Sequence, residues 1–217
     1  MRVWGWYLGI LAVLLGCWGY LVLNFHLVLD PMPTHFGLDG HPDGWSRKSL
    51  GTALGLAGMG PLILLVVGAG VSGLNNATAR DAGERQQLSA RLMSPVIAAW
   101  LFVLAAFIAI GVTAGLLGHH GPVVSWGLLG GILLATVVMA WRMRLVSRTV
   151  DAAHPPEEKE KRTRWGFYFN PEDPETMVSL ENGSYTTLNF ARPGAWGILA
   201  MLLGPVIVLV TVATLAD

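Results

Sequence analysis

Long apolar runs dominate the pattern of hydrophobic and polar positions along the chain. Each run approaches or exceeds the roughly 20 residues that an α-helix needs to cross about 30 Å of hydrocarbon. None of the runs contains an acidic residue, which argues against an ion-coupled transporter, because such proteins usually need carboxylates inside the membrane. The sequence predicts an all-α integral membrane protein with five transmembrane helices, over Trp4 to Leu29, Leu50 to Leu74, Ser94 to Leu117, Val123 to Trp141 and Trp196 to Leu215.

The composition supports a membrane protein and excludes some kinds of binding site. Hydrophobic residues make up 53% of the chain and charged residues 13%, and the mean hydropathy is +0.53. The formal net charge is zero, so net charge gives no reason to expect direct binding to nucleic acid. The single cysteine, Cys17, rules out an intrachain disulfide and a multi-cysteine zinc site. Nothing in the sequence identifies a cofactor.

Lysine and arginine positions predict how the helices are oriented. The first apolar run is too long for the core of a signal peptide, and no small-residue cleavage site follows it, so we expect an uncleaved helix. With a cytoplasmic N-terminus, twelve of the fourteen cationic residues lie inside the cell, and only Arg47 and Lys48 lie outside. Because cytoplasmic loops are enriched in Lys and Arg, this orientation is predicted, with an extracytoplasmic C-terminus.

Glycine pairs predict close packing between helices. Gly51 and Gly55 on the second helix, and Gly111 and Gly115 on the third, have the G-x-x-x-G spacing that lets helix backbones approach closely. Such pairs also occur at dimer interfaces, but in a five-helix protein we expect them to pack within the chain.

The loop at 30–49, between the first two helices, has an unusual composition. Residues 30 to 48 contain three Pro, three Gly, two His, three Asp and one Trp. Proline fixes φ and glycine permits tight turns, so the loop is predicted to be rigid. A plain connection between helices does not need so many rigid and titratable groups. We therefore predict an extracytoplasmic ligand-binding site formed by Pro33, His35, Phe36, Gly40, Asp43 and Trp45.

Several interpretations of this loop are open. It can be a rigid cap, or a surface for a peptide or lipid headgroup with Phe36 and Trp45 as apolar anchors. It can also bind zinc or copper through its His and Asp side chains, or act as a sensor that titrates at about pH 6. A membrane enzyme that uses His35 with Asp39 or Asp43 is a further alternative. If the first helix reached Asp30, His26 and Asp30 would share one of its faces. Five of the six histidines are predicted on this side, namely His26, His35, His41, His119 and His120.

A motif in this loop resembles the signature of a known family. The positions that carry it are Pro33, Thr34, His35, Phe36, Gly40, Pro42, Asp43, Trp45 and Lys48. They resemble the P-x-H-F-x-x-x-G-x-x-D-x-W-x-x-K signature of a bacterial membrane domain of unknown function that is shared with SdpI-type immunity and signalling proteins. The resemblance covers about the first 75 residues. It implies a polytopic protein of the bacterial cell membrane that protects a cell from a secreted peptide toxin. In the best-known member, the protein also holds a DNA-binding repressor at the membrane.

The segment between the fourth and fifth helices is predicted to form a small cytoplasmic β-meander. A charged linker at 147–164 precedes an insert at 165–193. Strand-forming residues occupy Trp165 to Phe169, Thr176 to Leu180 and Ser184 to Phe190, and Asn182 with Gly183 is a hairpin signal. A sheet this small is insecure alone, so we expect it to dock on the bundle or on a partner.

The insert resembles a second small domain of unknown function found in bacterial membrane proteins. Asn170 and Asp173 are typical turn formers. The functional alternative is a docking surface for a cytoplasmic regulator, formed by Tyr168, Asn170, Asp173 and Asn189. The resemblance rests on Tyr168, Asn170, Pro171, Asp173, Pro174, Asn189, Phe190 and Pro193.

The predicted organisation combines these parts. A four-helix membrane domain at 1–146 carries the motif loop, the linker and the insert follow, and residues 194–217 form the fifth helix. The predicted function is that of a non-catalytic immunity or sensing protein in the lipid bilayer. It would bind a peptide or an envelope ligand outside and a regulator inside.

Overall fold

The chain folds into two compact units. The computed structural model describes residues 3–37, 39–78, 80, 83–155, 162–164, 167–180 and 185–200. The first unit comprises residues 1–81 and 87–150, and the second comprises residues 82–86 and 151–217. Each unit has hydrophobic core clusters of its own.

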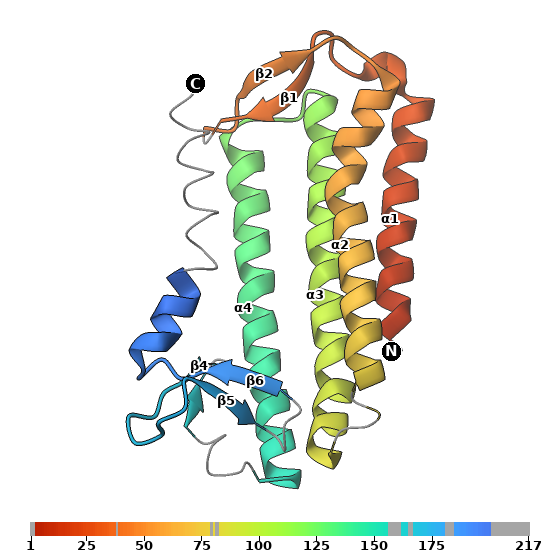
Figure 1. The fold of residues 1–217 in the computed structure, drawn as a ribbon. Helices are drawn as coiled ribbons and strands as arrows, with labels where there is room; N and C mark the ends of the chain where they lie inside the picture. Colours follow the sequence, from red (N-terminus) through yellow and green to blue (C-terminus); the bar gives the residue numbers. More distant parts are fainter. Residues whose placement is uncertain are drawn as a thin grey trace. The chain divides into compact units, whose positions relative to one another are not determined.

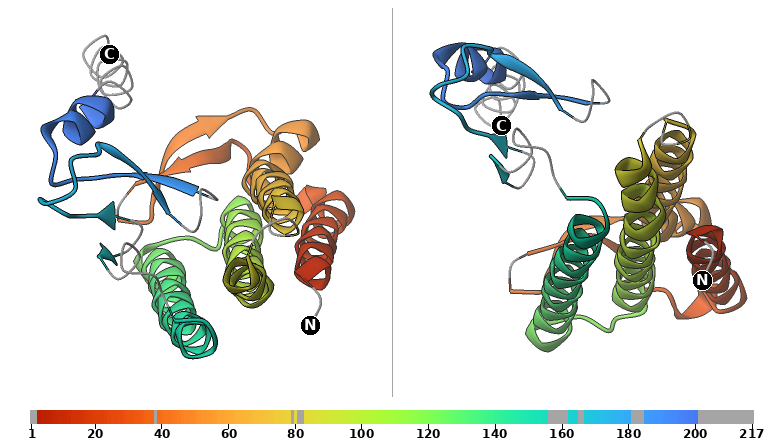
Figure 2. Two further views of the ribbon diagram at one scale, coloured as in Figure 1. Left: turned by 60° about the horizontal axis from the view of Figure 1, so that its bottom comes forward. Right: turned by 90° about the horizontal axis from the view of Figure 1, so that it is seen from below.

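Long helices build the first unit. α1 (Val3–Leu23), α2 (Leu50–Thr78), α3 (Glu84–Leu116) and α4 (Pro122–Ala153) are each long and apolar enough to cross a membrane. Four of the five predicted membrane helices are therefore present among the described residues, as expected for a multi-pass membrane protein. α1 packs against α2, and α1 and α4 lie on opposite sides of the unit with α2 and α3 between them (Figure 1, Figure 2).

Three helix ends differ from those predicted from the apolar runs. α1 ends at Leu23, six residues early, and a 3-10 turn at Phe25–Leu27 follows it, so His26 and Asp30 do not share a helix face. α3 begins at Glu84 and α4 continues to Ala153, both well beyond the apolar runs. For α3 and α4, the apolar run marks only the part of the helix that lies in hydrocarbon, and the polar turns beyond it leave no such mark. For α1 the apolar run continues past the helix end, because apolar residues also occupy the 3-10 turn.

Small residues on α2 let the neighbouring helices approach, but they are not the predicted pair. A Cβ added at Gly51 would meet only Ser49 Oγ, at 3.8 Å, and a Cβ added at Gly55 would meet no atom within 4 Å, so neither glycine is in close contact with another helix. Close approaches occur instead at other glycines of α2, such as Gly58, where the Trp18 indole lies against the backbone and donates from Nε1 to the carbonyl of Leu54 over 2.9 Å. On α3, Gly111 packs against Leu128, as expected for packing within the chain, and Gly115 packs against Phe36 of the loop.

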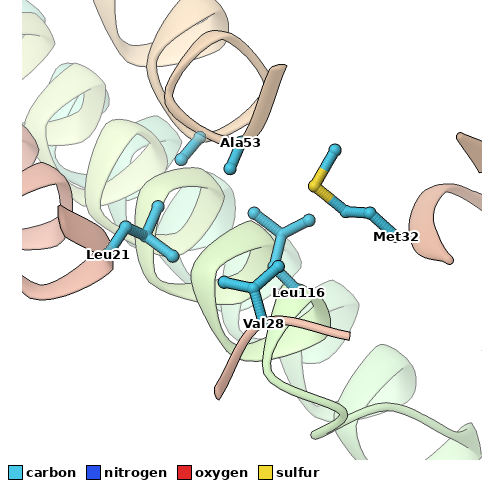
Figure 3. Close-up of a cluster of buried hydrophobic side chains, with 6 residues drawn as sticks. Leu21, Val28, Met32, Ala53 and Leu116 are labelled. Atoms are coloured by element: carbon cyan, nitrogen blue, oxygen red, sulfur yellow. The ribbon is translucent and has the colours of Figure 1, made fainter. Parts of the chain in front are cut away.

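A buried cluster joins the helices to the loop that follows α1. Its members come from α1, α2, α3 and the loop, and their side chains converge on one point (Figure 3). Met32, the first residue of strand β1 (Met32–Phe36), is fully buried in it. The loop is therefore attached to the helices by its own side chains as well as by its two ends. The cluster consists of Leu21, Val28, Met32, Ala53, Ala57 and Leu116.

The second unit contains short antiparallel strands. β3 (Thr163–Arg164) pairs with β4 (Phe167–Tyr168), and β5 (Met177–Leu180) pairs with β6 (Tyr185–Leu188). A parallel bridge joins Tyr168 to Asn189. The described strands therefore form two-stranded sheets linked by this bridge, where a single three-stranded meander was predicted. The predicted turn at Asn182 and Gly183 lies outside the described residues.

The predicted linker at 147–164 has other bounds in the structure, and the predicted last helix lies only partly within the described residues. Residues 147–153 continue α4 and β3 begins at Thr163, so both ends of the predicted linker at 147–164 have regular structure. The helix predicted over 194–217 is described only to residue 200, with residues 193–200 helical, and residues 201–217 lie outside the described part of the chain.

Candidate functional site

The loop at 30–49 folds into a β-hairpin. β1 pairs with β2 (Pro42–Ser46) in antiparallel register, with Met32 opposite Ser46 and Phe36 opposite Pro42. Register shifts lie on both sides of His35. The Gly37 N–H donates to the carbonyl of His41 over 2.9 Å and closes the hairpin loop. Such irregularities in register bend and twist a strand, so they change the direction in which the side chains near His35 point.

The tip of the hairpin is held against the turn that joins α3 to α4. The Gly40 carbonyl accepts a hydrogen bond of 2.9 Å from the Gly121 N–H. Gly40 has a φ of 76°, and a Cβ there would lie 2.7 Å from the Gly121 carbonyl oxygen and would overlap Ser125 Oγ. Gly40 is therefore required by both its backbone conformation and its surroundings.

Aromatic rings hold the middle of the hairpin. The Phe36 ring packs on Gly115 of α3, where a Cβ would lie only 2.7 Å from Cζ. The His120 ring lies between two hairpin rings, with its centroid 6.2 Å from that of Phe36 and 6.1 Å from that of His41. Phe36 therefore anchors the hairpin to the bundle and is not free to contact a ligand with its whole ring.

Lys48 fastens the base of the hairpin. Its Nζ donates to the carbonyls of Val28 over 2.5 Å and of His26 over 3.2 Å, and it lies 5.2 Å from the centroid of the Phe25 ring. Lys48, which follows β2, thus supplies hydrogen bonds to the carbonyls just after the end of α1. The motif includes this lysine, but its spacing does not reveal that it acts on the residues just after the first helix.

The exposed face of the hairpin carries a hydrogen-bonded His–Asp pair and an indole. His35 Nδ1 lies 2.5 Å from Asp43 Oδ1, with the two side chains 73% and 54% exposed. Asp43 and Trp45 are two residues apart on β2 and share its outer face, and Trp45 is 50% exposed. Gly44 makes room for His35, because a Cβ at Gly44 would lie 2.9 Å from that of His35.

The six predicted ligand-binding residues therefore divide into two groups. Pro33 and Gly40 are buried and Phe36 is half-buried, so these three shape and anchor the hairpin. The other three present polar and aromatic groups to the surroundings. An imidazole held by a carboxylate keeps its Nε2 free for a ligand, and a half-exposed indole offers both apolar surface and an N–H donor. The exposed group is His35, Asp43 and Trp45.

Five of the six histidines lie at the hairpin end of the first unit, namely His26, His35, His41, His119 and His120. Over the described ranges, no three His, Cys, Asp or Glu side chains are close enough together to hold a metal ion. His35 pairs with Asp43, and His120 faces the rings of Phe36 and His41. The rings of His35, His41 and His120 are thus each in contact with a neighbouring side chain.

The four predicted docking residues of the insert bind one another. The Tyr168 hydroxyl donates to Asp173 Oδ2 over 2.9 Å and accepts from Asn170 Nδ2 over 3.1 Å. Asn189 is fully buried, and its Nδ2 donates to the carbonyls of Asn170 and Asp173 over 2.9 and 3.1 Å. Its Oδ1 accepts from the N–H groups of Asn170 and Ala191. This network, called the asparagine network below, holds the turn at 170–174 in place.

Comparison with known proteins bears on the same part of the chain. Residues 12–60 match the family model described as a domain of unknown function (DUF1648). The matched stretch runs from α1 through the hairpin into α2, so it contains both the exposed group and the residues that anchor the hairpin. No curated protein and no solved structure matches the chain.

Proposed function

We propose that this is a non-catalytic immunity or sensing protein of the bacterial cell membrane, of the type that its motif resembles, the SdpI type. In this proposal the hairpin end faces outwards, and the N-terminus and the β insert lie in the cytoplasm. The asymmetry of Lys and Arg supports this orientation. The match of residues 12–60 to a domain of unknown function covers the α1, hairpin and α2 region on which the proposal rests.

The observation that carries the proposal is that some residues of the hairpin anchor it to the helices while others stay exposed. A backbone hydrogen bond holds its tip, ring contacts hold its middle and the Lys48 ammonium holds its base, while His35, Asp43 and Trp45 remain exposed. A rigid surface binds at a lower entropic cost than a mobile loop, and aromatic residues supply much of the binding energy at interfaces. The ligand proposed for this surface is a peptide or another component of the cell envelope.

A second surface supports a role for the insert in signalling. Phe167 and Trp196 are largely exposed in the second unit, and Phe190 links them, with ring centroids 5.1 Å from Phe167 and 5.4 Å from Trp196. Exposed aromatic groups of this kind are typical of protein interaction sites. The proposed partner is a cytoplasmic regulator, which would dock on these rings, whereas the asparagine network keeps the insert folded.

Photochemical crosslinking in growing cells of the encoding organism tests the outer surface. With a photoreactive phenylalanine analogue in place of Trp45, we expect an adduct with a secreted peptide or an envelope component, identified by mass spectrometry. Because His35 and Asp43 share this face, His35→Ala or Asp43→Asn should lower the adduct yield by about tenfold or more. A probe at Leu15, which is exposed on α1, provides the control and should react with lipid.

Two outcomes would contradict a binding surface. One is an adduct at Trp45 whose yield is unchanged by both His35→Ala and Asp43→Asn. The other is the absence of any adduct other than lipid at Trp45.

The close contact between His35 and Asp43 also favours one alternative function, a membrane enzyme or metal-binding protein. A carboxylate that orients an imidazole is a common arrangement in acid–base catalysis and around metal ions. In that case His35→Ala alone should abolish activity and remove any metal found by elemental mass spectrometry, and Trp45→Ala should have little effect. A binding surface should depend on Trp45 to a similar degree as on His35.

A further inference from the structure

A polar pocket lies at the end of the first unit opposite the hairpin. It has a volume of about 340 Å³ and lies between the start of α1, the end of α2 and the first turns of α3. The apolar part of α2 ends at Leu74, just before the pocket, so the pocket lies at the depth expected for lipid headgroups. Much of its accessible lining is apolar, but it carries the polar side chains for which it is called the polar pocket, namely Asn76, Arg80, Gln87, Arg91 and Ser94.

The two arginines in this pocket carry charge that the described residues do not neutralise. Arg80 and Arg91 are exposed, and within the described ranges neither guanidinium forms an ion pair. Guanidinium groups bind phosphate and carboxylate oxygens through paired hydrogen bonds. The pocket is therefore suited to an anionic group that two arginines can contact at once.

Ser94 points to a ligand independently of the charges. Its side chain is only 3% exposed, and its Oγ is buried without a hydrogen-bond partner among the described atoms. A buried hydroxyl without a partner is costly, and such groups are uncommon in native proteins. Ser94 lines the polar pocket and also a second, apolar pocket on the same helix pair. Its hydroxyl therefore lies where a ligand that occupies both pockets would pass.

The apolar pocket runs along α2 and α3 towards the membrane interior. It has a volume of about 150 Å³, and Val67 and Val71, two of its α2 residues, are largely exposed. An apolar groove on the outer face of a membrane helix pair is open to acyl chains. The remaining lining residues are Leu64, Gly68, Ser72, Ser94, Ile97 and Leu101.

We infer that these two pockets together form a binding site for an anionic phospholipid of the leaflet at this end of the protein. The phosphate contacts Arg80 and Arg91, an ester oxygen accepts a hydrogen bond from Ser94, and one acyl chain lies in the groove beside Val67. A soluble phosphate would satisfy the arginines but would leave both Ser94 and the groove unused. The site is separate from the hairpin and does not depend on its function.

Lipid binding to the purified full-length chain in detergent tests this site. Native mass spectrometry would compare a phosphatidylglycerol with a phosphatidylcholine of the same acyl chains. Since each basic residue at a membrane surface strengthens anionic lipid binding about fivefold, the double variant Arg80→Ala/Arg91→Ala should weaken phosphatidylglycerol binding by about 25-fold. Arg144→Ala, which removes an exposed arginine of α4 outside the site, should leave that binding unchanged.

Ser94→Ala separates a lipid site from a general surface effect. Removing a buried hydroxyl without a partner should not lower the melting temperature of the delipidated protein, but it should weaken phosphatidylglycerol binding several-fold. The site would be refuted if the double arginine variant and Arg144→Ala lost equal affinity, or if Ser94→Ala bound phosphatidylglycerol like the wild type. Competition by glycerol 3-phosphate as strong as that by phosphatidylglycerol would also overturn it, because the ligand would then be a soluble phosphate.

Discussion

Replacing Asn189 by alanine should open the β structure of the second unit. The Asn189 side chain is fully buried and makes four hydrogen bonds to backbone groups. Alanine would leave those carbonyls and N–H groups without partners, at an expected cost of about 3–4 kcal/mol. Hydrogen exchange measured by mass spectrometry should then accelerate by about 100-fold or more in peptides that cover β5 and β6, with little change in α1 to α4.

Asn170→Ala is the matched control for this effect. The Asn170 side chain is half-buried, and one of its bonds is to Arg162, which is exposed. We expect a loss of about 1 kcal/mol, and thus a much smaller increase in exchange. If Asn189→Ala exchanged no faster than the wild type while a cytoplasmic partner was lost, Asn189 would be a docking residue and the asparagine network would not maintain the fold.

Gly40→Ala should detach the tip of the hairpin from the turn between α3 and α4. A Cβ at this position would be strained by the φ of 76° and would press on the Gly121 carbonyl, which as backbone cannot move away cheaply. The two effects together should cost about 2–4 kcal/mol. For a chain of this length, the melting temperature in detergent should fall by about 5–12 °C.

Gly37→Ala, in the same loop, is the control for Gly40→Ala. Gly37 is not in the left-handed region, and a Cβ there would meet mainly Oδ1 of Asp39, a side-chain atom that can rotate away at the cost of its exposed hydrogen bond from the His41 N–H. We expect a fall of about 2 °C or less. Equal melting temperatures for the two variants would mean that the tip is not held against Gly121.

The hydrophobic pattern could predict the four membrane helices because a span needs a long apolar run, and such runs are rare elsewhere. It could not predict where the helices end. At the end of α1, for example, the backbone N–H and the Nδ2 of Asn24 both donate to the Tyr20 carbonyl, and such a local contact leaves no signal in hydropathy. The hairpin was also not predictable. β1 and β2 each contain a proline and do not alternate between apolar and polar residues, so the usual strand signals are absent.

The candidate site was located by composition, but the roles of its residues were not. The density of Pro, Gly, His and Asp marks residues 30–48 as a structured surface, and all six predicted residues lie on the hairpin or its loop. Whether a residue faces outwards depends on distant contacts, such as that of Phe36 with Gly115, which lies 79 positions away. In the insert, the same dependence makes Tyr168 and Asn189 buried partners, although their residue types also suit a docking surface.

The proposed function requires the hairpin to face the outside of the cell, and cysteine labelling tests this directly. Cys17→Ser removes the only native cysteine, and Asp39→Cys or Arg148→Cys then places a thiol in the hairpin loop or near the far end of α4. In intact cells, a membrane-impermeant maleimide should label the Asp39→Cys variant, and should label the Arg148→Cys variant only after the cells are permeabilised. Labelling of the Arg148→Cys variant alone in intact cells would place the hairpin in the cytoplasm and contradict an extracytoplasmic binding role.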